Sequence, residues 1–378
     1  MEAVLMELKI EKAINQSLQN DINKSLIFQT IRRLGGISRS ELAHKLQASR
    51  STISRIIDTL IKDGYIEEGS KKSTSPVGKK SSMLYLSPSL GSVLSIDLSY
   101  GKFLINIRDF NASNLETIDL GDIDGSIQDL DTHLDKLRYY ISKYSVKGVG
   151  IGIPGEVNPK DFAINLCLFE QWNGLNLQQY VSDRLNIPVI VERDIFLSAI
   201  CENYYEPQFS GKDALYIKVS KDISTAFVSG DRLFRGFTGS AGQTTFSLIN
   251  PSSEAYKNGS RGYLDEVASF DNMIEPNSCT FVMNQEQRQF ILDLHSKMLI
   301  NTALVINPEV IVFTGLITSI EDLEPQYILP LQQKLIENLP TLAPKLCLSR
   351  HANESVHLGL VKTVLDHLIS EEFPYLSS

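Results

Sequence analysis

Residues 37–64 read ISRSELAHKLQASRSTISRIIDTLIKDG, and this stretch contains the strongest local signals for secondary structure in the chain. Ser38 and Glu41 have the spacing of a capping box, in which a Ser and a Glu side chain satisfy backbone N–H groups at the start of a helix. Ser49 is a residue type that caps a further helix, and Gly64 ends the apolar periodicity of that helix. Two helices joined by so short a break predict a helix-turn-helix.

The flanking residues extend this motif to a winged form. Residues 23–34 carry apolar side chains at helical spacing, which predicts a helix before the motif. Two short stretches, Tyr65–Glu67 and Leu84–Leu86, are typical of strands, and the Ser/Lys/Gly-rich residues 69–82 between them fit a flexible wing. We therefore expect a winged helix-turn-helix DNA-binding domain over residues 1–88.

The third helix of such a unit enters the major groove of DNA, with its N-terminal side chains at base edges. Arginines there bind guanine or phosphate, and hydroxyls near a helix N-terminus suit phosphate. The candidate DNA-binding residues are Arg39, Ser49, Arg50, Ser51, Thr52, Ser54, Arg55, Lys79 and Lys80, with Lys71 and Lys72 as further cations of the wing. The alternative is a small helical protein-interaction domain whose exposed faces simply carry charge. The capping box, the basic third helix and the Lys-rich wing together favour DNA.

The distribution of charge supports this interpretation, although the net charge of the chain is −9. Residues 22–86 contain 12 Lys or Arg and 5 Asp or Glu, so they carry +7 and the rest of the chain carries −16. A basic head on an acidic body is expected when one domain alone meets the phosphates of DNA.

Length and composition restrict the class of protein. A chain of 378 residues exceeds one ordinary core, which predicts two or three domains. No window of about 18 uninterrupted apolar residues occurs, and the N-terminus lacks a basic segment followed by an apolar one, so we expect neither a membrane span nor a secretory signal. The four cysteines form no C-x-x-C pair and are typical of free thiols in a cytosolic protein. We therefore expect a cytoplasmic protein.

From about residue 93 the pattern changes to that of an α/β protein. Short apolar runs, among them Val146–Ile153 and Val310–Phe313, alternate with helical segments. A strand–turn–strand unit over residues 92–109 is echoed by residues 213–233, which indicates two related α/β halves.

Motifs in a shared order resemble the ROK family, which groups repressors and sugar kinases on one actin-like fold. They are residues 37–43 and 49–57 in the head, and residues 150–157, 172–173, 187–194, 236–242 and 306–312 in the body. The resemblance runs from about residue 22 to residue 365. It implies an actin-like ATPase body of two subdomains, residues 89–200 and 201–378, with the C-terminal helix returning to the first.

Family kinases hold ATP phosphates on two glycine-rich turns, because only glycine lets the backbone N–H groups approach phosphate closely. In this chain the first turn reads Leu98-Ser99-Tyr100-Gly101, and the second, Lys221–Phe227, contains no glycine. Asp222 also brings negative charge to the place of the phosphates. Compared with the family pattern, both turns are therefore expected only to connect strands. We expect no bound ATP and no catalysis.

The zinc site of the family uses one histidine and three cysteines. In this chain Phe246 stands at the histidine position, and Tyr256, Asn258 and Tyr263 stand at the cysteine positions. None of these side chains supplies a thiolate ligand. We therefore expect no zinc, and no other metal or cofactor.

The resemblance also locates a sugar pocket. It places Asp194 at the family's catalytic base, where a structural or hydrogen-bonding role is favoured because the phosphate turns are lost. Arg193 replaces the usual Asn. The expected ligand-binding residues are Gly155, Asn173, Glu192, Arg193, Asp194, Gln243 and Asp265. Two alternatives stay open: Arg193 favours an anionic ligand such as a sugar phosphate, or it forms a salt bridge with Asp194 that closes the pocket.

These features together predict a DNA-binding transcriptional regulator of carbohydrate metabolism, a repressor by family expectation. Its DNA affinity would be tuned by a sugar, a sugar phosphate or a protein partner bound to a catalytically inactive body. A homodimer or homotetramer would bind a double-stranded operator with two half-sites. The alternatives are a sugar kinase with a regulatory head and an architectural DNA-binding protein that needs no ligand.

Overall fold

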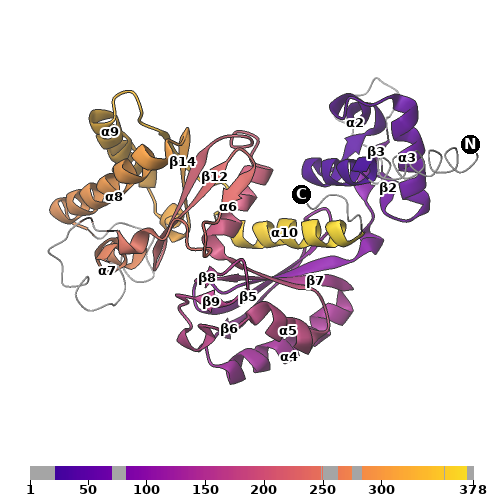
Figure 1. Ribbon diagram of the computed structural model, residues 1–378, viewed down its shortest axis with the longest axis horizontal. Coiled ribbons are helices and arrows are strands. Elements are labelled where there is room, and N and C mark those ends of the chain that lie inside the picture. The colour runs from indigo at the N-terminus through magenta and orange to yellow at the C-terminus, as the bar shows by residue number, and fades with distance from the viewer. Residues whose placement is uncertain are drawn as a thin grey trace, which may run out of the picture.

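The computed structural model describes residues 22–69, 82–247, 249, 263–274, 283–352 and 354–372. The chain forms a small N-terminal head and two α/β subdomains, and helix α10 runs along the body toward the head (Figure 1). Within the described ranges no helix is both long and apolar enough to cross a membrane.

The head is a winged helix-turn-helix, as predicted. It consists of helical residues 22–34, β1 (Ile37–Ser38), α2 (Arg39–Lys45), α3 (Arg50–Lys62), β2 (Ile66–Gly69) and β3 (Met83–Leu86). The capping box is confirmed, since the Ser38 hydroxyl accepts from the Glu41 N–H at 3.3 Å and the Glu41 carboxylate accepts from the Ser38 N–H at 3.0 Å. The two residues of β1 were not predicted, because so short a strand has no periodicity to detect.

The first subdomain is a five-stranded mixed sheet. Its elements are β4 (Ser92–Asp97), β5 (Lys102–Asp109), β6 (Asn114–Asp122), α4 (Ile127–Lys143), β7 (Val146–Ile153), α5 (Leu177–Leu185) and β10 (Val189–Arg193), with the two-stranded ribbon β8 (Glu156–Val157) and β9 (Ile164–Asn165). The strand order is β10-β7-β4-β5-β6, in which β4, β7 and β10 are parallel and β5 and β6 complete an antiparallel meander.

The second subdomain repeats this arrangement. Its elements are β11 (Ala214–Val219), β12 (Ile223–Ser229), β13 (Arg232–Phe234), α7 (Tyr263–Ala268), α8 (Gln285–Ile306), β14 (Val310–Thr314), α9 (Leu329–Asn338) and β15 (Lys345–Leu348). The order β13-β12-β11-β14-β15 again joins an antiparallel meander to two added parallel strands. The predicted relationship between the two halves is therefore confirmed by their topology.

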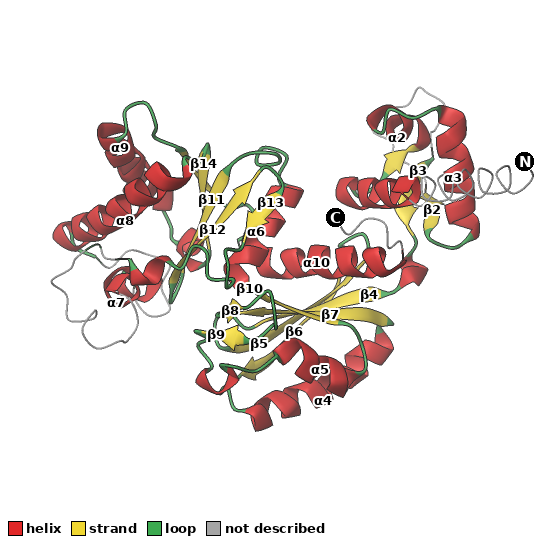
Figure 2. Cartoon of the chain, viewed as in Figure 1, coloured by secondary structure: helices red, strands yellow, loops and turns green. Residues whose placement is uncertain are grey.

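Two central helices, α6 (Asp194–Tyr205) and α10 (Ser355–Glu372), join the subdomains. Helix α10 covers one face of the first sheet, and α4 and α5 cover the other (Figure 2). Helix α6 covers the second sheet and also crosses α10. The crossing is so close that a Cβ atom on Gly359 of α10 would collide with the Leu197 carbonyl oxygen of α6. The subdomain boundary placed at residue 200 falls inside α6, which packs on both halves.

The head and the body share one hydrophobic core. Ile27 and Ile31 of the first head helix belong to the same buried cluster as Val361 and Leu365 of α10. At its edge, the buried Arg32 guanidinium forms an ion pair with Asp366 at 2.7 Å. The head is thus docked on the last helix of the body by both apolar packing and charge.

Replacing Leu365 by Ala is expected to lower the free energy of unfolding by about 2–5 kcal/mol, because a cavity opens in a fully buried site. Hydrogen exchange should also quicken in residues 22–34, since the cluster holds both elements. Chemical denaturation and exchange measurements check this. The matched control, Leu304→Ala on an exposed face of α8, should change stability by less than about 0.5 kcal/mol. A Leu365→Ala protein with unchanged stability would contradict the shared core.

Candidate functional site

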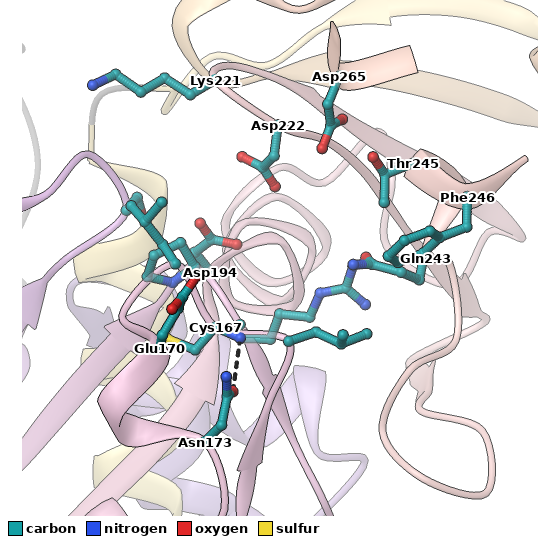
Figure 3. Close-up of a pocket in the computed structure, with 16 residues that line it drawn as sticks. Cys167, Glu170, Asn173, Asp194, Lys221, Asp222, Gln243, Thr245, Phe246 and Asp265 are labelled. Carbon is teal, nitrogen blue, oxygen red and sulfur yellow. Dashed lines mark hydrogen bonds between the residues drawn. The ribbon is translucent and has the colours of Figure 1, made fainter. Parts of the chain in front are cut away.

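A cavity of about 630 Å³ opens between the two subdomains at the N-terminal end of α6 (Figure 3). Glu170 and Asp194 face it from the first half of the body, and Asp222 and Asp265 face it from the second. Further lining residues are Ser99, Pro154, Gly155, Leu166, Cys167, Leu168, Asn173, Arg193, Lys221, Gln243, Thr245 and Phe246. The volume suits a small-molecule ligand.

Six of the seven residues predicted to bind ligand line this cavity: Gly155, Asn173, Arg193, Asp194, Gln243 and Asp265. Glu192 does not. Its buried carboxylate pairs with Arg235 and accepts the Arg193 backbone N–H at 2.8 Å. Residues on a strand alternate between its two faces, so neighbours in this motif point in different directions.

Arg193 is held by neutral acceptors of the second subdomain. Its guanidinium donates to the Ala241 carbonyl oxygen at 3.0 Å and to the Gln243 side chain. Burial lowers the pKa of Arg193, although nearby carboxylates oppose this. Among the described ion pairs none joins Arg193 to Asp194, and the cavity remains between the subdomains. The expectation of a pocket closed by that salt bridge is therefore wrong.

Asp194 pairs with Lys218 instead. The Lys218 ammonium lies 2.5 Å from Asp194 Oδ2 and 2.9 Å from Asp222 Oδ1, and only 2% of the lysine side chain is exposed. Burial by itself would lower the pKa of Lys218, but the two carboxylates raise it above its ordinary value. Burial raises the pKa of Asp194, and Lys218 opposes this rise. The pair ties α6 to β11 at the base of the cavity.

Sequence reasoning missed Lys218, although one signal was present. It is the only charged residue in the otherwise apolar strand Ala214–Val219, all of which is buried. A buried ammonium requires a carboxylate partner, so this lysine predicts an acidic residue opposite.

The cavity is acidic overall. Four carboxylates and two cations line it, which gives a net charge of −2, or −1 when the adjoining Lys218 is included. An anion entering this field would be repelled, whereas a neutral polyhydroxyl compound can donate hydrogen bonds to the carboxylates. The charge therefore disfavours the anionic-ligand alternative for this pocket.

The two turns at the nucleotide position contact each other directly. Asp97 accepts from the Ser99 backbone N–H at 2.9 Å, within the first turn. The half-buried Tyr100 side chain of that turn hydrogen-bonds Ser220, which directly precedes the second turn, and desolvation raises the pKa of Tyr100 to about 12. The Tyr100 side chain thus connects the two turns, and the absence of bound ATP stays a prediction.

The residues at the zinc positions are only partly visible. Phe246 lies in a short 3₁₀ helix, Thr244–Phe246, with about half of its surface exposed (48%). Tyr256, Asn258 and the side chain of Tyr263 lie outside the described residues. In the part of the chain that the structure describes, no three metal-ligating side chains come together. The absence of zinc stays a prediction.

The head presents most of the predicted DNA-binding residues on one helix. Ser49, Arg50, Ser51 and Arg55 are exposed at the start and along the outer side of α3, and Thr52 and Ser54 are half-buried. Arg39 is different, because its guanidinium pairs with Asp58 at 2.7 Å and with Glu68 at 2.8 Å. These ion pairs link α2 to α3 and β2, and contact of Arg39 with DNA stays a prediction. The wing lysines Lys71, Lys72, Lys79 and Lys80 lie outside the described residues.

Comparisons with known proteins agree with this architecture. A model of the ROK family matches residues 134–366, and a model of the MarR family matches residues 22–73. A xylose repressor of Caldicellulosiruptor bescii is 27% identical over 68% of this chain and 65% of its own length, so the chain spans about two thirds of that relative.

Solved structures show the same fold. A ROK family transcriptional regulator, a homologue of the Escherichia coli MLC protein, superposes with a TM-score of 0.73 at 20% identity, over 94% of this chain and 99% of its own. A ROK hexokinase from Thermus thermophilus superposes with a TM-score of 0.58 at 18% identity, over 73% of this chain and 99% of its own. Regulators and kinases thus share this body.

Removing the charge of Lys218 by Lys218→Met is expected to lower the free energy of unfolding by about 3–5 kcal/mol, because the buried carboxylate of Asp194 loses its cation. The double variant Lys218→Met/Asp194→Asn should recover most of this loss in chemical denaturation. Lys143→Met, which breaks an exposed pair with Glu116, is the matched control and should cost less than about 1 kcal/mol. Additive losses in the double variant would show that Lys218 and Asp194 do not interact.

Proposed function

Because the chain belongs to the ROK family, we propose that it is a DNA-binding transcriptional repressor of sugar-metabolism genes, whose body senses a neutral sugar and transfers no phosphate. The observation that carries this proposal is that one helix, α6, begins at the ligand pocket and ends at the DNA-binding head. The similarity to a xylose repressor supports the class of target genes.

The head supplies the grip on DNA. Helix α3 is positively charged on its exposed side, where Arg50 and Arg55 can reach guanine edges or phosphates. The hydroxyls at its N-terminus suit phosphate. A homodimer, or a homotetramer, would place two such helices on half-sites of a palindromic operator in the cytoplasm.

The pocket supplies the sensor. Its carboxylates accept hydrogen bonds from sugar hydroxyls, and its net negative charge discriminates against phosphorylated sugars. Asn173 accepts from the Cys167 N–H at 3.1 Å, which leaves its amide nitrogen as a donor toward the pocket. A neutral monosaccharide fits both the polarity and the volume.

Helix α6 supplies the coupling. Asp194 at its first turn lies in the pocket, and Tyr204 at its last turn accepts a hydrogen bond from Arg32 of the head at 3.2 Å. A sugar that engages Asp194 competes with Lys218 for the same carboxylate and so favours one position of α6 over another. If the sugar and DNA prefer different positions of α6, each lowers the affinity for the other by the same factor.

The runner-up function is a sugar kinase, since a hexokinase shares the fold. The local chemistry disfavours it. The second phosphate turn lacks glycine between Lys221 and Phe227, and the contact between Tyr100 and Ser220 joins the two turns. Lys218 also neutralises the carboxylate at the catalytic-base position.

Reversing the charges of α3 by Arg50→Glu and Arg55→Glu should abolish duplex binding while the fold remains intact. The expected loss is at least about 100-fold, with a shallower dependence of affinity on salt, by about 0.9 in log–log slope for each phosphate contact removed. Fluorescence anisotropy with a random-sequence duplex at low salt measures it, and circular dichroism checks folding. Lys345→Glu, on the exposed side of the body strand β15, is the control. Undiminished binding by the double variant would refute the head assignment.

A panel of pentoses, hexoses and N-acetylated amino sugars should contain at least one that raises the melting temperature, because a ligand of the native state stabilises it. The same sugar should change the affinity for genomic fragments that the protein selects. With ATP and magnesium present, no ADP should form. Turnover at ordinary enzyme rates would favour the kinase, and a panel with no stabilising sugar would favour a DNA-binding protein without a ligand.

A further inference from the structure

A second cavity, of about 260 Å³, lies where the head meets the body. Its walls come from the first head helix, α6, the β12–β13 hairpin and α10. It shares no lining residue with the sugar pocket at the other end of α6. A molecule bound here would touch the head and the body at the same time.

Three cations of this cavity surround one aromatic ring. Arg32, Arg33 and Lys362 lie 5.3, 5.5 and 5.7 Å from the ring centre of Tyr204. Cations this close repel one another, and the ring face compensates only in part. An anion bound among the three cations would reduce this repulsion.

The carboxylates present do not balance these cations. Asp366 pairs with both Arg32, at 2.7 Å, and Lys362, at 2.6 Å. Arg33 donates to the neutral hydroxyl of Ser210 at 2.7 Å. With Asp231 included, three cations and two carboxylates line the cavity, which leaves a net charge of +1 in a body that is acidic overall.

Two buried polar atoms of the lining residues lack a hydrogen-bond partner within the described part of the chain. They are Nη1 of Arg32, a side chain that is 2% exposed, and Oδ1 of Asn203. Buried polar atoms are almost always hydrogen-bonded, so an unpaired guanidinium N–H beside a cavity indicates an absent acceptor. The second observation thus agrees with the charge balance.

We infer that this junction cavity binds a small phosphorylated metabolite. The phosphoryl oxygens would accept charge-assisted hydrogen bonds from Arg32, Arg33 and Lys362. The cavity, at about 260 Å³, is several times larger than the space of one water, which is about 30 Å³. It therefore has room for a phosphoryl group and for a small organic part attached to it. The acidic pocket would thus bind neutral sugars, and the basic junction cavity would bind phosphorylated ones.

The site would act on the orientation of the head. A ligand held by Arg33 of the head and Lys362 of α10 cross-links two elements that otherwise meet through Arg32 and the apolar cluster. It therefore stabilises the docked arrangement, independently of what occupies the sugar pocket.

The test titrates the full chain with glucose 6-phosphate, with orthophosphate, and with KCl at matched ionic strength. Glucose 6-phosphate should raise the melting temperature by about 2–4 °C at concentrations well above its Kd, and KCl should not. Tighter binding of glucose 6-phosphate supports a phosphorylated metabolite, and equal binding of orthophosphate supports the same site with free phosphate as its ligand. Calorimetry should show that Arg33→Gln and Lys362→Met each raise the Kd at least about tenfold.

Two controls make the result decisive. Lys212→Met removes a half-exposed cation elsewhere on the body and should leave the Kd unchanged. Arg193→Gln alters the sugar pocket and should also leave it unchanged. The inference is overturned if KCl gives the same stabilisation, or if binding survives Arg33→Gln and Lys362→Met but is lost in Arg193→Gln.

Discussion

The close crossing of α6 and α10 is the constraint on which the rest of the structure depends. Gly359 brings the two helices into backbone contact at Leu197, and each helix then covers one of the two sheets. Both halves of the body are therefore built outward from one helix pair. Helix α6 begins at the cavity between the subdomains, and both helices reach the head, α6 through Tyr204 and α10 through the shared apolar cluster.

Two polar contacts link the halves of the body beside the cavity. Tyr100 of the first turn hydrogen-bonds Ser220 just before the second, and the buried Lys218 pairs with Asp194. An ion pair of this kind is costly to bury and costly to break, so it specifies one arrangement of the two halves.

Much of the fold was predictable from local chemistry. The Ser38–Glu41 capping box and the Ser49 cap correctly predicted the helix-turn-helix, and apolar runs correctly predicted the central strands. Strand β6 was not predicted, because its exposed, polar sequence lacks an apolar run. In the pocket, motif order located six lining residues, yet the partners of Arg39, Glu192 and Lys218 depend on contacts between distant segments, which a single sequence does not encode locally.

The docking of the head on α10 has a consequence for how the protein matures. Ile31 of the head belongs to the same apolar cluster as Val361, which lies some 330 residues later in the chain. At a synthesis rate of about 5–20 residues per second, the first helix waits roughly 15–65 s for that partner to emerge. The helix-turn-helix can fold on the ribosome within that time, but it acquires its fixed direction only when translation reaches the last helix. Nascent chains that stop early would therefore carry a DNA-binding head without the body's control over it.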